Sequence, residues 1–173
     1  MTKKFKASML KDEVDQYSQT LQFPVKYNEE EYIVKLYPFF SPVKISELVN
    51  DLAVFFKGLN EEGHSIDNSE EVGIVNCFIL KHFSDMQFYN GRKAKNRFKK
   101  LYDEFKYVIN SEVCQILIKS FPVESMEKVY EKIAEVIETG KKFERDKANI
   151  INTIKELPLE NEFLKEKALN EIK

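Results

Sequence analysis

The residues that could do chemistry are few in this chain, and only one pair has a spacing that suggests a site. The sequence holds two histidines, His64 and His82. His82 lies three residues before Asp85, so the two could share one face of a helix and form a general-base dyad or part of a metal site. A surface histidine beside a helical neighbour is the simpler explanation and the favoured one. A small hydrolase around this pair is therefore the third of three hypotheses.

The recurring catalytic and ligand-binding motifs do not occur in the sequence. It has no HExxH, no glycine-rich phosphate loop, no GxSxG and no Cys/His zinc spacing. Cys77 and Cys114 stand alone in apolar runs, which is typical of reduced thiols in a core. The carboxylates occur in solvated runs, and none forms a marked pair. We therefore expect a protein that is not an enzyme and that carries no cofactor and no metal.

One charge cluster stands out, the segment RKAKNRFKK at residues 92–100. It contains six basic residues and no acid: Arg92, Lys93, Lys95, Arg97, Lys99 and Lys100. Cations near the start of a helix oppose its macrodipole, so the cluster could serve to bind nucleic acid or another anionic partner. A solvated helix face, or pairing with the acidic loop 61–71 of the same chain, explains it equally simply and is favoured.

Composition limits the class of protein. With 173 residues the chain is long enough for one ordinary domain and an appendage. Its net charge of −2 gives no global attraction to nucleic acid or membrane. No apolar run reaches the roughly 20 residues of a membrane span, and the basic N-terminus lacks the apolar segment of a secretory signal. These features predict a protein of the cytoplasm without a membrane partner.

The early part of the chain predicts a β-hairpin followed by a helix. Apolar residues alternate with charged ones over 23–28 and 31–37, and Pro38 should end the second strand. Ser41-Pro42 is typical of a helix start, and apolar residues at helical spacing continue to about residue 57. Because a hairpin alone is only marginally stable, it should pack on a helix, and this helix is the first candidate.

The middle of the chain predicts three further helices. Ser69 is a plausible N-cap for a helix that is apolar on nearly every side through Leu80 and carries an apolar stripe as far as Met86. This helix should be central in the core, although a buried strand over 74–80 also fits. Residues 92–109 carry an amphipathic stripe that includes Ala94 and Phe98. Residues 112–121 predict a short helix that Pro122 ends.

The tail carries an apolar seam with heptad spacing. Apart from Gly140 and Lys147, which are poor seam residues, its members within the chain are Met126, Val129, Ile133, Val136, Phe143, Ile150, Ile154 and Leu157. One interpretation is a single long coiled-coil helix. The other, slightly favoured, places Gly140 at a C-cap between two antiparallel helices. A short charged helix from Glu160 should finish the chain. The seam either closes on the chain itself or docks a partner helix or a second copy, and both remain open.

Together these patterns predict an α+β fold that is mainly α. An N-terminal β-hairpin packs on a helical domain, and a C-terminal helical hairpin or long coiled-coil helix follows. The predicted divisions are an N-terminal arm or helix over 1–22, a hairpin and helical core over 23–122, and a helical extension over 123–173.

The stretch from Tyr32 to Leu52, which contains IVKLYPFFSPVKISELVNDL, and the later INSEVCQILIKSFP together resemble small virion-morphogenesis proteins of phages and prophages of Gram-positive bacteria. Such proteins open with a short β-element and a turn of YxPF type, then continue helically. Tail-assembly chaperones are one such class: helical, non-enzymatic proteins that bind structural proteins during tail assembly. The resemblance covers about residues 30–120 and transfers no site residue. The long charged tail departs from it.

The first hypothesis is thus a non-enzymatic phage protein that binds other proteins through helical surfaces, as a virion assembly factor. Its expected binding residues are Met126, Val129, Ile133, Val136, Phe143, Ile150 and Ile154. Its partners would be phage structural proteins, and self-association is a further expectation. The second hypothesis is a nucleic-acid binder that uses residues 92–100. A structural virion component and a phage-encoded inhibitor of a host protein are alternatives within the first class.

Overall fold

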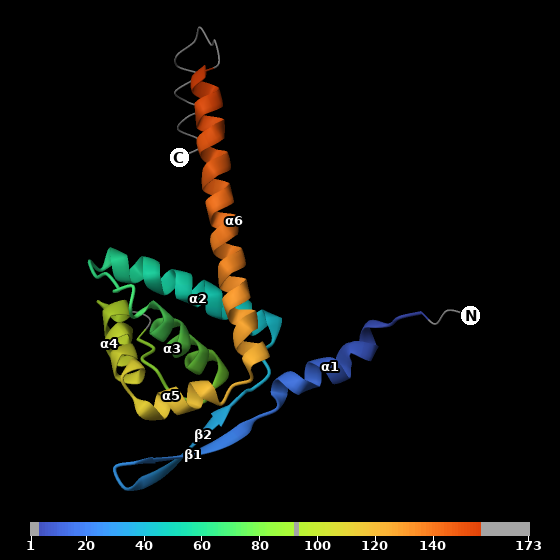
Figure 1. Ribbon diagram of the computed structural model, residues 1–173, viewed down its shortest axis with the longest axis vertical. Coiled ribbons are helices and arrows are strands. Elements are labelled where there is room, and N and C mark those ends of the chain that lie inside the picture. Colours follow the sequence, from blue (N-terminus) through green and yellow to red (C-terminus); the bar gives the residue numbers. More distant parts are fainter. Residues whose placement is uncertain (1–3, 92–93, 157–173) are drawn as a thin grey trace. The chain divides into compact units, whose positions relative to one another are not determined.

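The structure, a computed structural model, describes residues 4–91 and 94–156, with side chains described as far as Asn152 (Figure 1). Within these ranges the fold is α+β and mainly α, as the sequence predicted. Short 3₁₀ turns flank the first helix. The elements in order are α1 (Lys11–Asp15), β1 (Leu21–Tyr27), β2 (Glu30–Leu36), α2 (Pro42–Glu61), α3 (Glu71–Phe83), α4 (Arg97–Ile109), α5 (Glu112–Lys119) and α6 (Val123–Glu156).

The chain separates into two compact units, Met1–Tyr130 and Glu131–Lys173. The boundary falls inside α6, after its eighth residue. The first unit contains the hairpin and the globular core, and the second contains most of α6. The divisions predicted at residues 22 and 122 stay predictions. Residue 22, at which the predicted arm ends, lies within β1.

The hairpin forms where the alternating pattern predicts it. β1 and β2 pair antiparallel, with Tyr27 opposite Glu30. Asn28 and Glu29 between them both have positive φ, of 50° and 66°, as a two-residue type I′ turn requires. The sequence suggested α2 as the first candidate support. The hydrogen bonds that hold the hairpin instead join β2 to the residues that end α3, where Tyr37 N donates to Phe83 O and Asp85 N donates to Lys35 O.

The core of the first unit is built on aromatic rings around α3. The ring of Phe78 on α3 lies 5.5 Å from that of Phe55 on α2 and 5.2 Å from that of Phe105 on α4. A second pair, Phe40 and Phe83, stacks with ring centroids 3.7 Å apart. All five side chains are buried, and α3 contacts α2, α4 and α5. The sequence prediction of a central core helix is confirmed, and the alternative strand over 74–80 does not occur.

Two helix starts differ from the sequence prediction. Ser69 is not the N-cap of α3, because its backbone N–H and its hydroxyl both donate to Asp67 Oδ1, each at 2.9 Å, in the preceding turn. The helix begins two residues later. α4 begins at Arg97 rather than at residue 92, because Asn96 adopts the left-handed conformation that interrupts a helix. Ala94 therefore does not extend the apolar stripe of α4.

α6 is one continuous helix of 34 residues, so the favoured hairpin of two antiparallel helices is wrong. Gly140 lies within it and does not have the positive φ of a C′ glycine. The cost of about 1 kcal/mol for an internal glycine is too small to break a long helix whose other residues are good helix formers. The short helix predicted from Glu160 lies outside the described residues.

The first two turns of α6 are fixed within the first unit. The buried hydroxyl of Ser125 donates to Pro38 O at 2.7 Å. Val129 is fully buried. Tyr130 Oη donates to Asn76 Oδ1 of α3 at 3.2 Å. The start of the helix is therefore held by both packing and hydrogen bonds.

The same substitution at two glycines should have opposite effects. A Cβ at Gly140 would meet no atom within 4 Å, so Gly140→Ala should stabilise α6 by up to about 1 kcal/mol. A Cβ at Gly58 on α2 would lie 2.0 Å from the ring of Phe98, so Gly58→Ala should destabilise the first unit by about 1–3 kcal/mol. Tryptic cleavage after Lys141 and urea unfolding measure the two effects. Faster cleavage in Gly140→Ala would show that residue 140 ends a helix.

Candidate protein-interaction site

An apolar stripe continues along α6 after its buried start. Beyond Tyr130 the exposed fractions are 44% for Val136, 52% for Ile137, 65% for Phe143 and 50% for Ile150. Val136, Phe143 and Ile150 are spaced seven residues apart, and Ile137 follows Val136 directly, so a single broad face of the helix carries them. We name the set Val136, Ile137, Phe143 and Ile150 the α6 stripe. Large exposed apolar residues gathered on one face mark a surface for a partner.

The α6 stripe is wider than the seam that the sequence suggested. With Met126 at heptad position a, the exposed members occupy positions d and e, and Ile133 at a is half-buried. The original pattern considered positions a and d alone and so missed Ile137. A search for a, d and e together, which is usual for an amphipathic helix packed on one side, would have found it.

The predicted binding residues are not all available on this surface. Val129 is fully buried and Met126 half-buried at the start of α6, within the first unit. Val129 contributes to the fold and cannot be a contact residue for a partner in this structure, because the helix start that carries it packs in the core. The side chain of Ile154 lies outside the described residues. The exposed part of the seam consequently begins after Tyr130.

The residues of the basic segment 92–100 do not lie on one element of the structure. Arg92 and Lys93 lie outside the described residues. Lys95 is exposed in the turn before α4, and the remaining three, Arg97, Lys99 and Lys100, lie in its first turn. The single basic helix face that the sequence suggested is thus not formed by the described residues.

Two acidic side chains of the same chain lie beside the first turn of α4. Glu62, at the end of α2, caps α4: its carboxylate accepts from Phe98 N at 3.3 Å and from Lys99 N at 2.9 Å. A negative charge there offsets the unfavourable cations near the helix N-terminus. Lys99 also forms an ion pair with Asp103. Glu62, which belongs to the acidic loop 61–71, thus lies beside the basic segment but bonds its backbone N–H groups, and the ion pair of Lys99 is made outside that loop.

Two of the other basic side chains lie over aromatic rings. The guanidinium of Arg97 lies 4.4 Å from the centre of the Phe98 ring, and Lys100 Nζ lies 5.5 Å from that of Tyr89. Both distances are within the range of cation–π attraction. Tyr89 is itself held by its backbone N–H, which donates to Glu104 Oε2 at 2.6 Å. Both basic side chains thus have an aromatic partner within the first unit, although Lys100 remains exposed.

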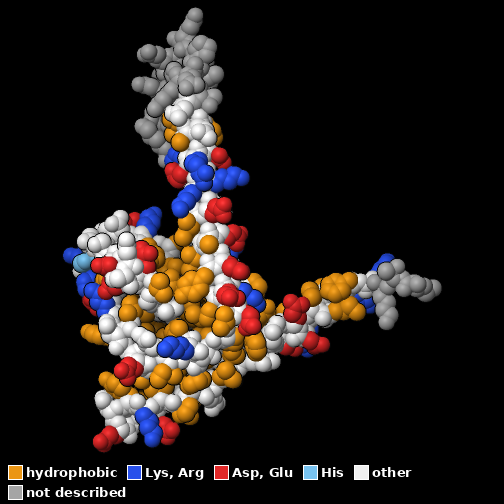
Figure 2. All heavy atoms as spheres, in the orientation of Figure 1, with side chains coloured by type: hydrophobic (Ala, Val, Ile, Leu, Met, Phe, Trp, Pro, Cys, Tyr) orange, Lys and Arg blue, Asp and Glu red, His pale blue; other side chains and the backbone are white. Residues whose placement is uncertain are grey.

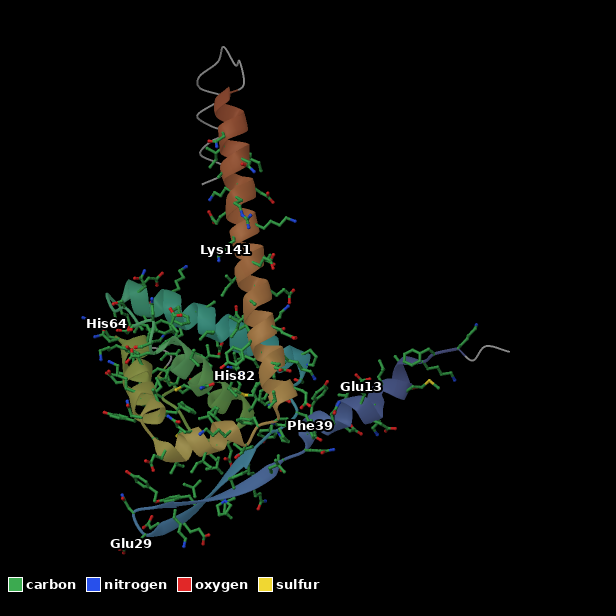
Figure 3. The ribbon with its side chains drawn as sticks, viewed as in Figure 1. Glu13, Glu29, Phe39, His64, His82 and Lys141 are labelled. Atoms are coloured by element: carbon green, nitrogen blue, oxygen red, sulfur yellow. The ribbon has the colours of Figure 1, made fainter. Side chains whose placement is uncertain are left out.

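The predicted dyad of His82 and Asp85 is not formed. Asp85 Oδ1 accepts from Lys35 N of β2 at 2.8 Å, so this carboxylate holds the hairpin. The carboxylate beside His82 is that of Asp51, with Oδ2 3.2 Å from Nε2, although the geometry is not that of a hydrogen bond and Nε2 has no such partner. Burial lowers the pKa of the His82 imidazole, neighbouring Lys81 lowers it further, and Asp51 opposes both. The two histidines lie on separate elements (Figure 3).

A cleft of about 360 Å³ lies between α2, α3 and the start of α4. Its walls include the rings of Phe55, Phe78 and Phe98 and the ion pair in which Lys81 Nζ lies 3.1 Å from Asp51 Oδ2. His82 is not among the described residues that line it. The cleft therefore does not bring an imidazole to a place where a substrate could reach it, as the hydrolase hypothesis requires.

The described residues form neither a cluster that could hold a metal ion nor a helix that could span a membrane. No three His, Cys, Asp or Glu side chains in residues 4–91 and 94–152 gather closely enough to hold a metal ion. Over the described part of the chain, none of the helices combines the length and the apolar content that crossing a bilayer demands.

Comparison with known proteins gives one family and one relative. The family described as YomO matches residues 7–170. The chain is also 25% identical over 128 residues to the "SPbeta prophage-derived uncharacterized protein YomO" of Bacillus subtilis (strain 168), and the match covers 74% of this chain and 72% of that protein. No solved structure matches.

The state of His82 predicts how stability depends on pH. Its pKa is lower in the folded chain than in the unfolded one, so below about pH 6.5 the unfolded state binds a proton that the folded state does not. The free energy of unfolding should therefore fall as the pH is lowered through this range. Urea unfolding between pH 7.5 and 5.5 measures the slope. His82→Gln should flatten it, and the control His64→Gln should not. An equal slope in wild type and His82→Gln would contradict the assignment.

Proposed function

The chain belongs to the YomO family and is a phage or prophage protein, and on this premise we propose that it is a non-enzymatic virion assembly factor. It acts in the host cytoplasm by binding other proteins. The α6 stripe is its binding surface, and the partners are proteins of the virion, most simply those of the tail.

The exposed α6 stripe is the observation that carries this proposal. Four large apolar side chains, Val136, Ile137, Phe143 and Ile150, are each close to half exposed or more on one face of a helix. Burying apolar surface stabilises a complex by about 25 cal/mol per Å² before the cost of ordering is subtracted. A helix with such a face is the kind of element that lies in a groove or pairs with another helix.

The assembly role is supported by two further points. The stretch from Tyr32 to Leu52 resembles proteins of virion-morphogenesis modules, among them tail-assembly chaperones, which are helical and non-enzymatic. The relative in Bacillus subtilis is named as derived from a prophage. Both points favour a protein that works with other phage proteins over one that acts on a small molecule.

Nucleic-acid binding through residues 92–100 has less support. Binding to a phosphate backbone requires cations that remain available to the solvent. Of the described cations, Lys95 and Lys100 are exposed, whereas Arg97 and Lys99 are half-buried against Phe98 and Asp103, and Glu62 adds a negative charge beside them. We therefore do not propose this function.

Complementation of a deletion tests the proposal. In a phage or prophage that lacks this gene, we expect a loss of infectious particles and the accumulation of particles without complete tails. The wild-type gene should restore them. Ile137→Asp plus Phe143→Asp should not, because two buried carboxylates in an apolar contact cost several kcal/mol.

The matched control is Ala134→Asp plus Ala148→Asp. Both alanines are exposed on α6 and lie off the stripe, so this variant adds the same charge to the same helix. It should restore infectious particles as the wild type does. Full complementation by the stripe variant would overturn the proposal, and circular dichroism should verify that all variants keep wild-type helix content.

A further inference from the structure

The β-hairpin has two outer edges, and its register shows which backbone groups lie on them. Tyr27 and Glu30 flank the two-residue turn, so they form a hydrogen-bonded pair, and such pairs alternate along the hairpin. The backbone N–H and C=O groups of the residues between these pairs point away from the other strand. On β2 these residues are Glu31, Ile33 and Lys35, and on β1 they are Gln22, Pro24 and Lys26.

The outer edge of β1 is poorly suited to a further strand. Pro24 lies in the middle of β1 and has no N–H to donate. A proline at an outward position is one of the devices by which proteins keep the edge of a sheet from pairing with another chain. A strand that adds to this hairpin should therefore add to β2.

The outer edge of β2 is covered at one end only. Lys35 N donates to Asp85 Oδ1 at 2.8 Å, and Asp85 N donates to Lys35 O at 3.0 Å. No further bridge follows along this edge among the described residues, and none of them bonds the outward N–H and C=O groups of Glu31 or Ile33. Two donors and two acceptors are thus left at an open strand edge.

Apolar side chains lie on both faces of the hairpin next to this edge. Tyr32 is on the same face as Leu36, which is buried, but Tyr32 itself is 47% exposed. Ile33, on the opposite face, is 61% exposed. An added strand would cover both side chains, because residues directly opposite each other in a sheet have Cβ atoms about 5 Å apart.

Carboxylates gather at the tip of the hairpin, beside the open edge. Residues 26–31 contain one lysine and the three residues Glu29, Glu30 and Glu31, so their net charge is −2. Figure 3 labels Glu29 at the tip, and Figure 2 shows acidic side chains there. The ion pairs of the described residues include none of these three carboxylates. A strand with basic side chains would therefore be attracted to this edge.

A second copy of the hairpin does not fit the open edge. Two copies would pair β2 with β2 about a two-fold axis, and three such axes use both open residues. An axis at Tyr32 or at Ile33 places a glutamate of the copy opposite Lys35, where Asp85 already lies. An axis at Glu31 sets this carboxylate beside its own copy, and like charges directly opposite are unfavourable. The edge therefore suits a strand of another protein.

We infer that the edge of β2 at Glu31 and Ile33 binds an extended segment of a partner protein in which apolar and basic residues alternate. The segment adds as a third strand of the sheet, with its basic residues on the face of Glu31 and its apolar residues on the face of Tyr32. Backbone hydrogen bonds supply the affinity, and the alternation supplies the specificity. The inference goes beyond the proposed function and does not depend on the α6 stripe, which belongs to the second unit.

Titration of the full chain with a capped hexapeptide that alternates valine and lysine tests the inference. The dissociation constant should be below about 1 mM. In NMR spectra the amides of Glu31 and Ile33 should become protected from exchange, whereas that of Lys35, already bonded to Asp85, should not change. N-methylation of the peptide's lysines, whose amides face the edge, should abolish binding. No binding of the unmodified peptide at about 1 mM, or equal binding of the N-methylated one, would overturn the inference.

Proline substitutions at matched positions of the two strands locate the binding edge. Ile33→Pro removes an outward donor without breaking a bond to β1, so it should weaken peptide binding by at least about tenfold. The control Gln22→Pro changes the corresponding kind of position on β1 and should bind as the wild type does. Wild-type affinity in Ile33→Pro, or an equal loss in Gln22→Pro, would contradict the assignment.

A charge variant tests the same edge without a change in backbone. Glu31→Gln should weaken binding of the valine–lysine peptide by about two- to fivefold at low salt, and added salt should reduce the difference. A peptide that alternates valine and glutamate should bind more weakly than the valine–lysine peptide. Equal affinity for the two peptides would overturn the basic character assigned to the partner. Since no variant here touches α6, loss of complementation by the stripe variant remains a separate result.

Discussion

Apolar residues at heptad spacing stay on nearly the same face along the whole length of an α-helix, and this constraint governs α6. The apolar face that later carries the α6 stripe begins at Val129, which is fully buried in the first unit. The hydroxyls of Ser125 and Tyr130 also fix this part of the helix. The same face then continues for three heptads with large side chains that are close to half exposed or more. The start of the helix is stabilised by the fold, and the remainder requires something else to cover it. The proposed function follows from this requirement.

The core of the first unit, in contrast, is closed by contacts within that unit. The rings of Phe55, Phe78 and Phe105 meet across three helices, and Asp85 ties the hairpin to the end of α3. In its most conspicuous charge cluster, Lys99 pairs with Asp103, and Glu62 caps the helix start. Asp85, Glu62 and Asp103 therefore serve the stability of the first unit.

Much of the fold could be predicted from the sequence, because local patterns determine it. Alternation predicts the hairpin, and Ser41-Pro42 predicts the start of α2, where Ser41 Oγ accepts from Lys44 N. The failures depend on contacts distant in sequence. Glu62 lies about 36 residues before the helix that it caps, and Asp85 pairs with Lys35 at a separation of 50 residues. Gly140 was misread because a glycine is compatible with both a C-cap and a helix interior, and only the conformation decides.

Only part of the candidate site could be predicted, because heptad spacing is a local pattern and does not show which residues the fold buries. Heptad spacing identifies Val136, Phe143 and Ile150, and Ile137 is missed because a two-position seam is too narrow. Heptad spacing also includes Val129, which is buried in the first unit. Periodicity shows which face of a helix is apolar, but it does not show where along the helix that face stops being buried. For the same reason it could not separate a basic surface from a compensated one at residues 92–100.

Hydrogen–deuterium exchange measured with and without proteins of the phage virion tests most directly whether another molecule covers α6. The account predicts that amide protection over residues 131–152 is low in the isolated chain and increases when these proteins are added, while protection of the core helix α3 stays constant. Protection of 131–152 that is already high in the isolated chain and does not change would contradict it, because the stripe would then be covered by the chain itself.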